Sequence, residues 1–482
     1  MLTVHSIKLI LKNHSEEYAA REMITAHIPK VKIEICDCVP DSTDDYVISS
    51  LEIKDGRYIY ATVLNLSNKL YNDCTAENKY SKTYVKKSIN SAFCRALGTN
   101  LPWGLITGIR PSKIVRELAD SGVSRTEIKK YLKDFYLCSD DKIKIATDVA
   151  YREKELIRTI PKNSVSLYVG IPFCPTRCLY CSFTSQSVKF SNKLTEPYMD
   201  ALEKEIISTA EIIKNNGLTI DTVYIGGGTP TSLSEAQLKR LLECLFRYFE
   251  LGSIREVTFE AGRPDTITYE KLNIIKEFGI SRISINPQTM NQKTLDIIGR
   301  RHTPEDIVRT YELAEKLGFN HINTDIIAGL PEENEADFDY TLNELEKLNP
   351  QSITVHTMSV KHGSFLDGKY SMYTQTAADT VNNMLNNAAK RMKKLNKKPY
   401  YMYRQKNMLG NLENVGYCDA NHECLYNIYI MEEVQSIYSV GAGASTKIIN
   451  GSKIDRIFNV KEVSEYIKRI DEMIERKDIL KL

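Results

Sequence analysis

Three cysteines stand close together in the segment GIPFCPTRCLYCSF, at Cys174, Cys178 and Cys181, while the other cysteines are scattered along the chain. Three thiolates on one short loop can ligate three irons of a [4Fe-4S] cubane and leave the fourth iron without a protein ligand. An open metal position is what catalysis needs, whereas a structural zinc site or a ferredoxin-type cluster would need a fourth ligand nearby. The spacing therefore predicts a [4Fe-4S] cluster with one open iron.

A glycine-rich turn, YIGGGTPT, contains Gly227, Gly228 and Thr229 and follows a predicted strand. Glycine lets a backbone approach a ligand closely and adopts dihedral angles that other residues avoid. By itself such a turn is equally consistent with an ordinary connection between a strand and a helix. At the end of the strand that follows the cysteine loop, it indicates a ligand cradle.

The elements that position these residues alternate between strand and helix from residue 164 onward. Helical patterns separate six predicted strands, at residues 165–172, 222–226, 256–261, 282–286, 322–327 and 352–357. Parallel strands need a return of helix length, so the pattern predicts an α/β fold with a parallel sheet and outer helices. Six units are too few for a complete eight-fold barrel, so we expect a partial (β/α)6 barrel with its chemistry at the carboxyl ends of the strands.

The flanking parts follow other patterns. Residues 1–160 are predicted to form an α+β domain of unknown role, residues 161–360 the barrel, and residues 361–482 a mixed extension that covers the substrate. The turn LPWGLITGIRPSKI around Trp103 is typical of interdomain packing, with a lid or substrate contact as the alternative. In the extension we expect helices at 374–395 and 460–481 and a short strand at 427–430.

Composition limits the other possibilities. The net charge is +2, from 64 basic and 62 acidic residues, which provides no overall field for nucleic acid. There is no signal-peptide pattern and no apolar run of roughly 18 residues, so we expect a cytoplasmic protein without a membrane span. The cysteine count is 11, an odd number in a long chain, which argues against a secreted disulfide framework. No coiled-coil repeat appears, and a monomer is expected.

The scattered cysteines carry weaker signals. Cys36 and Cys38 are interpreted as part of a strand, with a ligand pair as the alternative. Cys418 and Cys424 lie in a polar stretch and could contact a second site.

The cysteine loop, with Tyr180 as the aromatic residue before its third cysteine, resembles the radical S-adenosylmethionine (SAM) signature. From Tyr168 to Ser445 the chain resembles the oxygen-independent coproporphyrinogen III oxidase family. The shared segments are YVGIPFCPTRCLYCSF, GGGTPT, QTMNQKTLDIIGRRHT, DIIAGLP and VGAGAS. The WGLITGIRP turn and the PYYMYRQKNMLGNLENVGY segment are similar to those of the HemZ-type coproporphyrinogen dehydrogenases, which extends the resemblance to nearly the whole chain.

The resemblance implies that SAM binds the open iron and is cleaved by an electron from the reduced cluster to a 5′-deoxyadenosyl radical. A reductant protein such as a flavodoxin or ferredoxin would supply that electron. The residues that match the family's SAM-binding positions are Tyr168, Tyr180, Gly227, Gly228, Thr229, Glu260, Gln288, Arg300 and Asp325. Arg300 is the natural carboxylate partner, because a guanidinium binds a carboxylate through two hydrogen bonds, although the neighbouring Arg301 is an alternative.

The implied reaction is oxidative decarboxylation of two propionates of coproporphyrinogen III to the vinyl groups of protoporphyrinogen IX, a step of haem biosynthesis. Because the substrate carries four carboxylates, cationic side chains are expected near it. The candidates are Arg263, Arg404 and Lys406, with a solvated surface charge as the alternative for Arg263 and Lys406. Arg404 has the better claim, because tyrosines beside it could flank a tetrapyrrole.

Two positions depart from the family patterns. Phe183 stands where the oxidases carry a fourth cysteine, which puts transfer of their substrate chemistry in doubt but not the cluster. The stretch YNIYIM, at 426–431, stands where the related haem chaperones have an HNxxYW motif. This departure disfavours a haem-binding or haem-delivering protein, which is kept as one alternative, and a radical SAM methyltransferase or another tetrapyrrole-modifying enzyme is a second. A non-enzymatic scaffold is the residual possibility.

Overall fold

The computed structural model describes residues 4–38, 41, 43–182, 186–249, 254–360, 364–366, 377–405, 408–451 and 453–480. The chain forms two compact units. Unit 1 contains Met1–Thr147 together with Arg404–Leu412, and unit 2 contains Asp148–Tyr403 together with Glu413–Leu482. The expected three domains, with boundaries at 160 and 360, stay a prediction.

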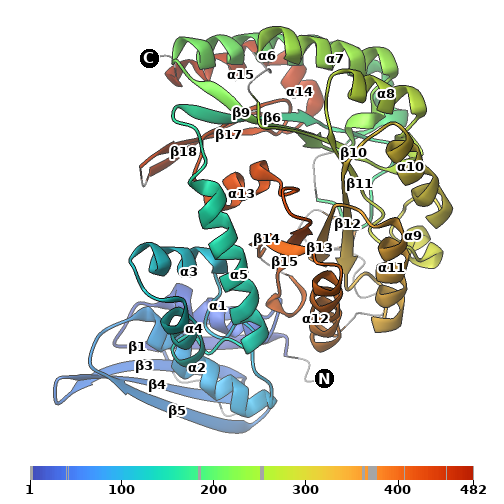
Figure 1. Ribbon diagram of the computed structural model, residues 1–482. Coiled ribbons are helices and arrows are strands. Elements are labelled where there is room, and N and C mark those ends of the chain that lie inside the picture. Colours follow the sequence, from blue (N-terminus) through green and yellow to red (C-terminus); the bar gives the residue numbers. More distant parts are fainter. Residues whose placement is uncertain are drawn as a thin grey trace. The chain divides into compact units, whose positions relative to one another are not determined.

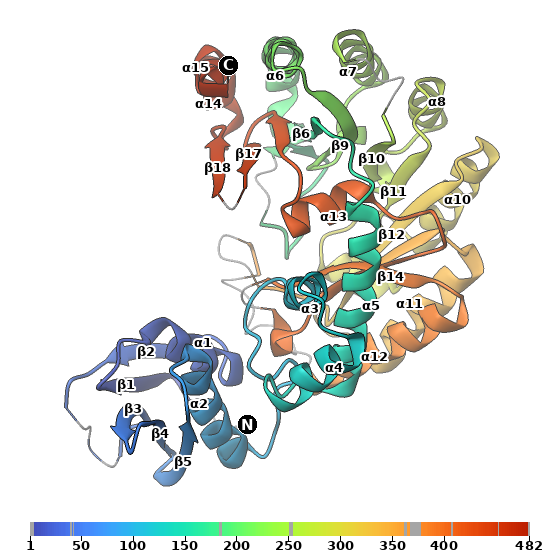
Figure 2. The ribbon, with the colours of Figure 1, turned by 60° about the vertical axis from the view of Figure 1, so that its left-hand side comes forward.

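Unit 1 is built on a five-stranded sheet against which helices α1 (Glu17–His27) and α2 (Lys82–Leu97) pack (Figure 2). The strand order is β2-β1-β3-β4-β5. The strands are β1 (Ser6–Lys12), β2 (Lys32–Ile35), β3 (Tyr46–Lys54), β4 (Arg57–Leu66) and β5 (Lys69–Glu77). The sequence did not predict β5, because none of its residues is fully buried and it lacks an apolar face. Three further helices follow, α3 (Pro111–Asp120), α4 (Arg125–Asp134) and α5 (Asp140–Ile157).

Unit 2 contains an 11-stranded sheet in the order β14-β15-β13-β12-β11-β10-β9-β6-β16-β17-β18. The six predicted strands are its parallel centre, which confirms the α/β partial barrel: β6 (Ser164–Ile171), β9 (Thr219–Gly227), β10 (Glu256–Gly262), β11 (Arg282–Ile285), β12 (His321–Ala328) and β13 (Ser352–Thr357). The helices between them cover the outer side of the sheet (Figure 1): α6 (Val188–Asn215), α7 (Glu235–Tyr248), α8 (Tyr269–Glu277), α10 (Pro304–Lys316) and α11 (Glu335–Leu348).

The C-terminal part extends this sheet at both edges. β15 (Asn414–Cys418) pairs antiparallel with β13, and β14 (Lys398–Tyr403) pairs with β15. At the opposite edge β16 (Ile437–Val440) pairs parallel with β6 and leads into a hairpin of β17 (Ser445–Asn450) and β18 (Lys453–Phe458). The C-terminal extension is thus part of the same sheet as the barrel strands.

The strand predicted at 427–430 is wrong, because these residues lie in helix α13 (Leu425–Glu432). Aromatic and β-branched residues in this stretch favour a strand. However, the carboxylate of Glu256 accepts hydrogen bonds from the backbone N–H groups of Leu425 and Tyr426, at 2.7 and 3.2 Å. A carboxylate at this end satisfies donors that a helix leaves open and interacts favourably with the helix dipole. This cap comes from a distant strand, so it is invisible in the local sequence.

The remaining helical predictions agree with the structure where residues are described. α12 (Ala378–Lys394) lies within the segment predicted at 374–395, whose first residues, 374–376, fall outside the described part. α14 (Val463–Lys468) and α15 (Ile470–Glu475) lie within the segment predicted at 460–481. No helix among the described residues is both long enough and apolar enough to cross a membrane.

Candidate cluster and cofactor site

The cysteine loop follows the first barrel strand directly. β6 ends at Ile171, and the chain then passes through the short strand β7 (Phe173–Cys174) into the loop. The side chains of Cys174 and Cys178 are buried, and that of Cys181 is half-buried. Because β6 is a central strand that is buried along nearly its whole length, the loop starts from a rigid support.

Contacts with the segment that follows helix α9 (Gln292–Ile297) hold the loop in place. The backbone N–H of Leu179 donates to the carbonyl of Ile298 at 3.0 Å. The hydroxyl of Thr176 donates to the carbonyl of Gly299 at 3.1 Å. The loop therefore has a defined path although it contains little regular structure.

A buried guanidinium lies beneath the same loop. Arg263 pairs with both carboxylate oxygens of Asp265, at 2.8 and 2.9 Å, and donates to the carbonyl and hydroxyl of Thr176 at 3.1 and 2.8 Å. Arg263 is only 3% exposed, and its Nη1 lies 3.9 Å from the sulfur of Cys178. These contacts favour a role in supporting the loop over the contact with substrate that the sequence predicts.

The glycine-rich turn after β9 contacts the start of the cysteine loop. The N–H of Gly228 donates to the carbonyl of Ile171, and that of Thr229 to the carbonyl of Phe173, both at 2.7 Å. A Cβ atom at Gly228 would lie 2.6 Å from the carbonyl oxygen of Phe173 and 3.0 Å from the sulfur of Cys174. Only glycine fits at this position, because the turn is in direct contact with the start of the cysteine loop.

Glu260, near the end of β10, is held by a tyrosine on the neighbouring strand. The hydroxyl of Tyr224, on the neighbouring strand β9, donates a hydrogen bond to its carboxylate. Burial raises the pKa of Glu260 to about 7, and the nearby carboxylate of Asp325 adds to the rise, whereas the hydrogen bond from Tyr224 opposes it. Glu260 is therefore a carboxyl group that titrates close to neutral pH.

Three tyrosine rings stack beside this carboxyl group. The rings of Tyr224 and Tyr426 have centroids 4.6 Å apart, and that of Tyr168 lies 6.3 Å from each of them. Tyr426 comes from helix α13, so its place in the stack could not be predicted from the short-range pattern around it. A signal for Tyr224 was its position directly before the glycine turn on the second strand.

Gln288 and Asp325 meet across the ends of β11 and β12. The N–H of Gln288 donates to the carbonyl of Asp325 at 2.9 Å, and the N–H of Ile327 donates to the carbonyl of Gln288 at 3.0 Å. Gln288 has φ of 68°, a left-handed conformation that is uncommon for a residue with a Cβ atom. Such conformations persist where the surrounding structure enforces them, often at functional sites.

The side chain of Asp325 contacts two neighbours on barrel strands. Asn323 donates to one carboxylate oxygen at 2.8 Å, and Nε2 of His356 lies 3.6 Å from the other. Burial by itself would raise the pKa of Asp325, but the interactions with His356 and Asn323 hold it below its ordinary value. His356 could not be identified from the sequence, because a single histidine on a strand carries little information.

Arg300 and Tyr180 are brought together as a pair. The guanidinium donates to the hydroxyl of Tyr180 at 3.2 Å and to the carbonyl of Asn286 at 3.1 Å. Arg300 is 7% exposed, whereas Arg301 is exposed to solvent. Burial lowers the pKa of the adjacent His302 to about 4, and the positive charge of Arg300 adds to this effect.

Arg404 has a different environment. Its guanidinium donates to the carbonyls of Ile106, Gly108 and Asn411, and it lies over the ring of Trp103. The residue is 2% exposed, and all of these partners belong to unit 1. These contacts favour a role in holding the tryptophan turn over the substrate contact predicted from the sequence.

The described residues fit a bound polar group. Arg300 Nε and both ring nitrogens of His302 are buried without a hydrogen-bond partner among the residues described. The crowding at Gly228 shows how closely the backbone approaches the cysteine sulfur. In the part of the chain that the structure describes, no three His, Cys, Asp or Glu side chains are grouped to hold a single metal ion. A [4Fe-4S] cubane is not a single-ion site, because each of its three thiolates binds a different iron.

Two residues that the sequence singles out, Phe183 and Lys406, lie outside the described residues.

The chain is similar to known proteins over most of its length. The family model for the radical SAM superfamily matches residues 168–345. The oxygen-independent coproporphyrinogen-III oxidase-like protein HemZ of Bacillus subtilis (strain 168) is 38% identical over 444 residues, which are 90% of this chain and 87% of that protein. The haem chaperone HemW of the same organism is 36% identical over 197 residues, 41% of this chain and 51% of that protein.

Among solved structures, the coproporphyrinogen III oxidase HemN from Escherichia coli, described as a radical SAM enzyme, has a TM-score of 0.54. The match covers 67% of this chain and 73% of that one, at 23% sequence identity. At this identity the likeness shows a shared fold.

Proposed function

Since the chain belongs to the radical SAM superfamily, and within it to the family of HemZ-type oxygen-independent coproporphyrinogen-III oxidase-like proteins, we propose that it converts coproporphyrinogen III to protoporphyrinogen IX. The reaction is an oxidative decarboxylation without oxygen, a step of haem biosynthesis. The observation that carries the proposal is the 38% identity to HemZ across 90% of the chain. It is supported by the three-cysteine loop at the carboxyl end of the first barrel strand.

In this proposal Cys174, Cys178 and Cys181 hold a [4Fe-4S] cluster at the end of β6. When bound, the cluster and SAM would supply the 5′-deoxyadenosyl radical that is needed to take a hydrogen atom from a propionate β-carbon of the substrate. The substrate then loses CO2 and gives up one electron to an acceptor at each of the two propionates. A flavodoxin or ferredoxin is the proposed source of the electron that reduces the cluster.

The chain's other residues would bind and orient SAM. Arg300 offers buried donors for the carboxylate of SAM. Its Nε has no hydrogen-bond partner among the described residues, and a guanidinium can bind a carboxylate through two hydrogen bonds. Gly228 and Thr229 keep the turn close to the cysteine sulfur. Glu260 and Asp325 supply carboxylate acceptors for hydroxyl or amino groups. Gln288 joins the segment after β11 to β12 through its backbone, which fixes the position of Asp325 relative to β11.

A second candidate function is haem binding, which the similarity to HemW favours over 197 residues. In the chaperone motif a histidine corresponds to Tyr426. Here the side chain at this position is buried and stacked on Tyr224. Haem added to the protein should therefore produce no Soret band of the kind that an axial histidine at this position would give. A stoichiometric haem complex would favour the chaperone function.

The experiment is anaerobic reconstitution with iron and sulfide, followed by incubation with coproporphyrinogen III, SAM and dithionite. The expected products are 5′-deoxyadenosine and protoporphyrinogen IX, whose mass is lower by two CO2 and four hydrogen atoms. A Cys181→Ala variant serves as the matched control and should form neither product. Formation of 5′-deoxyadenosine with unchanged porphyrinogen would contradict the substrate, and gain of a methyl group would indicate a methyltransferase.

A further inference from the structure

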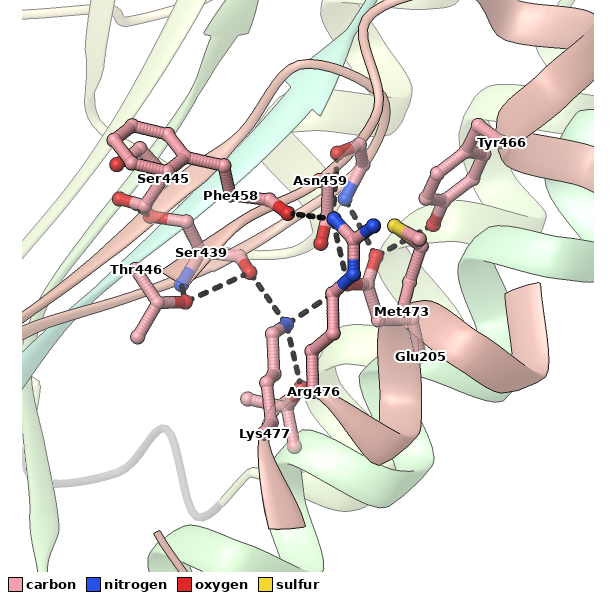
Figure 3. A network of polar contacts seen from close by, with 12 residues as sticks. Glu205, Ser439, Ser445, Thr446, Phe458, Asn459, Tyr466, Met473, Arg476 and Lys477 are labelled. Atoms are coloured by element: carbon pink, nitrogen blue, oxygen red, sulfur yellow. Dashed lines mark hydrogen bonds and ion pairs between the residues drawn. The ribbon is translucent and has the colours of Figure 1, made fainter. Parts of the chain in front are cut away.

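A fully buried ion pair joins helix α6 to the C-terminal end of unit 2 (Figure 3). Nζ of Lys477 lies 2.8 Å from Oε1 of Glu205, and the two side chains are 2% and 0% exposed. Removing two charges from water is unfavourable, and the attraction between them compensates only if their remaining hydrogen bonds are also made. The other hydrogen-bond partners of Glu205 and Lys477 therefore show which segments the ion pair holds together.

The carboxylate of Glu205 accepts four hydrogen bonds in all. Besides Lys477, Asn459 donates to Oε1 at 2.6 Å. The hydroxyl of Tyr466 donates to Oε2 at 2.5 Å, and the backbone N–H of Gly441 donates to the same oxygen at 2.7 Å. Gly441 directly follows β16, Asn459 follows β18, and Tyr466 lies in helix α14. Besides the segment of Lys477, the carboxylate of Glu205 therefore binds three C-terminal segments to α6.

The ammonium of Lys477 completes the cluster on the other side. It donates to the backbone carbonyl of Ser439, in β16, at 2.6 Å and to the hydroxyl of Thr209 at 3.4 Å. Glu205 and Lys477 thus bind the backbone at the end of β16, at Gly441 directly after the strand and at Ser439 within it.

Gly441, which this network holds, presses against the last part of the first barrel strand. A Cβ atom at Gly441 would lie 2.4 Å from the carbonyl oxygen of Gly170 and 2.7 Å from the hydroxyl of Tyr198. Tyr198 donates to that same carbonyl at 2.6 Å and accepts from the N–H of Ala442 at 3.2 Å. The next residue, Ile171, accepts the hydrogen bond from Gly228. The end of β6 is therefore clamped between the two glycine turns.

The backbone N–H groups of the first four residues of the GAGAS turn all donate to groups within the protein. The N–H groups of Gly441, Ala442, Gly443 and Ala444 donate to Glu205, Tyr198, the carbonyl of Val460 and the carbonyl of Gly441, respectively. Its role in the fold is to contact β6.

We infer that Glu205 and Lys477 are positioning residues for the cofactor site. They fix Gly441 against Gly170 and so hold the point from which the cysteine loop leaves β6. The inference rests on the proposed function in one respect only, that this site binds a cluster and SAM. Loss of the ion pair should let the end of β6 shift and should weaken SAM binding, because the glycine turn after β9 is hydrogen-bonded to the same strand end.

The first test compares Lys477→Met with Lys397→Met. Lys397, whose side chain is also fully buried, forms an ion pair with both carboxylate oxygens of Asp419 at 2.9 Å, although that carboxylate is partly exposed, and the pair lies at the far edge of the same sheet beside β14. After anaerobic reconstitution, iron and sulfide are measured, and SAM is titrated while the electron paramagnetic resonance spectrum of the reduced cluster is recorded. We expect the SAM dissociation constant to rise about tenfold or more in Lys477→Met and to change less than about twofold in Lys397→Met. Equal SAM affinity in both variants would overturn the inference.

A second pair of variants covers the case in which Lys477→Met does not fold. Gly441→Ala adds a methyl group that collides with Gly170, whereas Gly443→Ala adds one whose closest contact, with Lys461, is 3.7 Å. Both glycines have positive φ, 103° and 72°, so both substitutions carry backbone strain. Weaker SAM binding confined to Gly441→Ala supports the inference, and equal effects of both substitutions contradict it.

The readout does not depend on porphyrinogen turnover. If the wild-type protein binds SAM but leaves coproporphyrinogen III unchanged, the substrate proposal fails while the variants still report on SAM affinity. Failure of the positioning inference and failure of the proposed function are therefore distinguishable.

Discussion

The hydroxyl of Tyr224 donates a hydrogen bond to the carboxylate of Glu260 across two neighbouring strands of the barrel. This contact places a partly buried carboxyl group beside the glycine turn that follows Tyr224 in the same strand. A Cβ atom at Gly226 would lie 2.7 Å from Oε2 of Glu260, so the backbone and the carboxyl group are in direct contact. The backbone of Gly227, in the same turn, partly offsets the rise in the pKa of Glu260.

The raised pKa of Glu260 predicts how stability depends on pH. The pKa is about 7 in the folded protein and 4.5 without the protein environment, so the folded state binds the proton more tightly. Its contribution to the free energy of unfolding is complete below pH of about 4.5 and is lost as the pH rises to about 7. Urea denaturation of the cluster-free protein between these values should show this loss, and Glu260→Gln should remove it. An identical pH dependence in wild type and Glu260→Gln would contradict the prediction.

Replacement of any one loop cysteine should prevent cluster assembly. Cys174→Ala, Cys178→Ala and Cys181→Ala each remove one thiolate, and iron and sulfide bound per chain should fall to a small fraction of wild type. Cys244→Ala, a buried cysteine in helix α7, is the matched control and should retain the cluster. Retention of a full cluster in any loop variant would show that another group ligates the iron.

Gly228→Ala should disrupt the site by crowding. The added methyl group would meet the carbonyl of Phe173 at 2.6 Å and the sulfur of Cys174 at 3.0 Å, so the loop must move. Overpacking of this kind costs about 1–3 kcal/mol, and we expect lower cluster content and weaker SAM binding, measured by iron analysis and equilibrium dialysis. Gly108→Ala, where nothing lies within 4 Å of the new Cβ atom, should leave both quantities unchanged.

Arg404→Met should destabilise unit 1. The substitution leaves the backbone carbonyls of Ile106 and Asn411 without a cationic donor, and such losses cost roughly 2–4 kcal/mol together. Trp103 is the only tryptophan and lies under this guanidinium, so its fluorescence reports unfolding at this place.

The exposed Arg309→Met serves as the control for Arg404→Met and should change stability by less than about 0.5 kcal/mol. Unchanged unfolding of Arg404→Met, combined with weaker use of the porphyrinogen, would instead favour the substrate contact that the sequence predicts.

The sequence predicted the parallel strands well because each is a short buried run separated from the next by a helix of sufficient length. The cysteine loop was equally easy to identify from the sequence, since its three cysteines lie within eight consecutive residues, 174–181. The strand predicted at 427–430 was wrong because Glu256, a residue far away in the sequence, caps the helix that forms there. β5 was missed because an edge strand without buried residues has no apolar pattern to detect.

The sequence by itself therefore determined the fold class and the spacing of the cluster ligands, because both depend on local periodicity and on residues that are neighbours along the chain. Only the tertiary structure decided the partners of the buried charges. Arg263 pairs beneath the cysteine loop, Arg404 enters the tryptophan turn, and Glu205 meets Lys477 across 272 positions of sequence. An arginine or lysine reads the same in a sequence whether it faces substrate or protein, and burial among specific partners is what distinguishes the two.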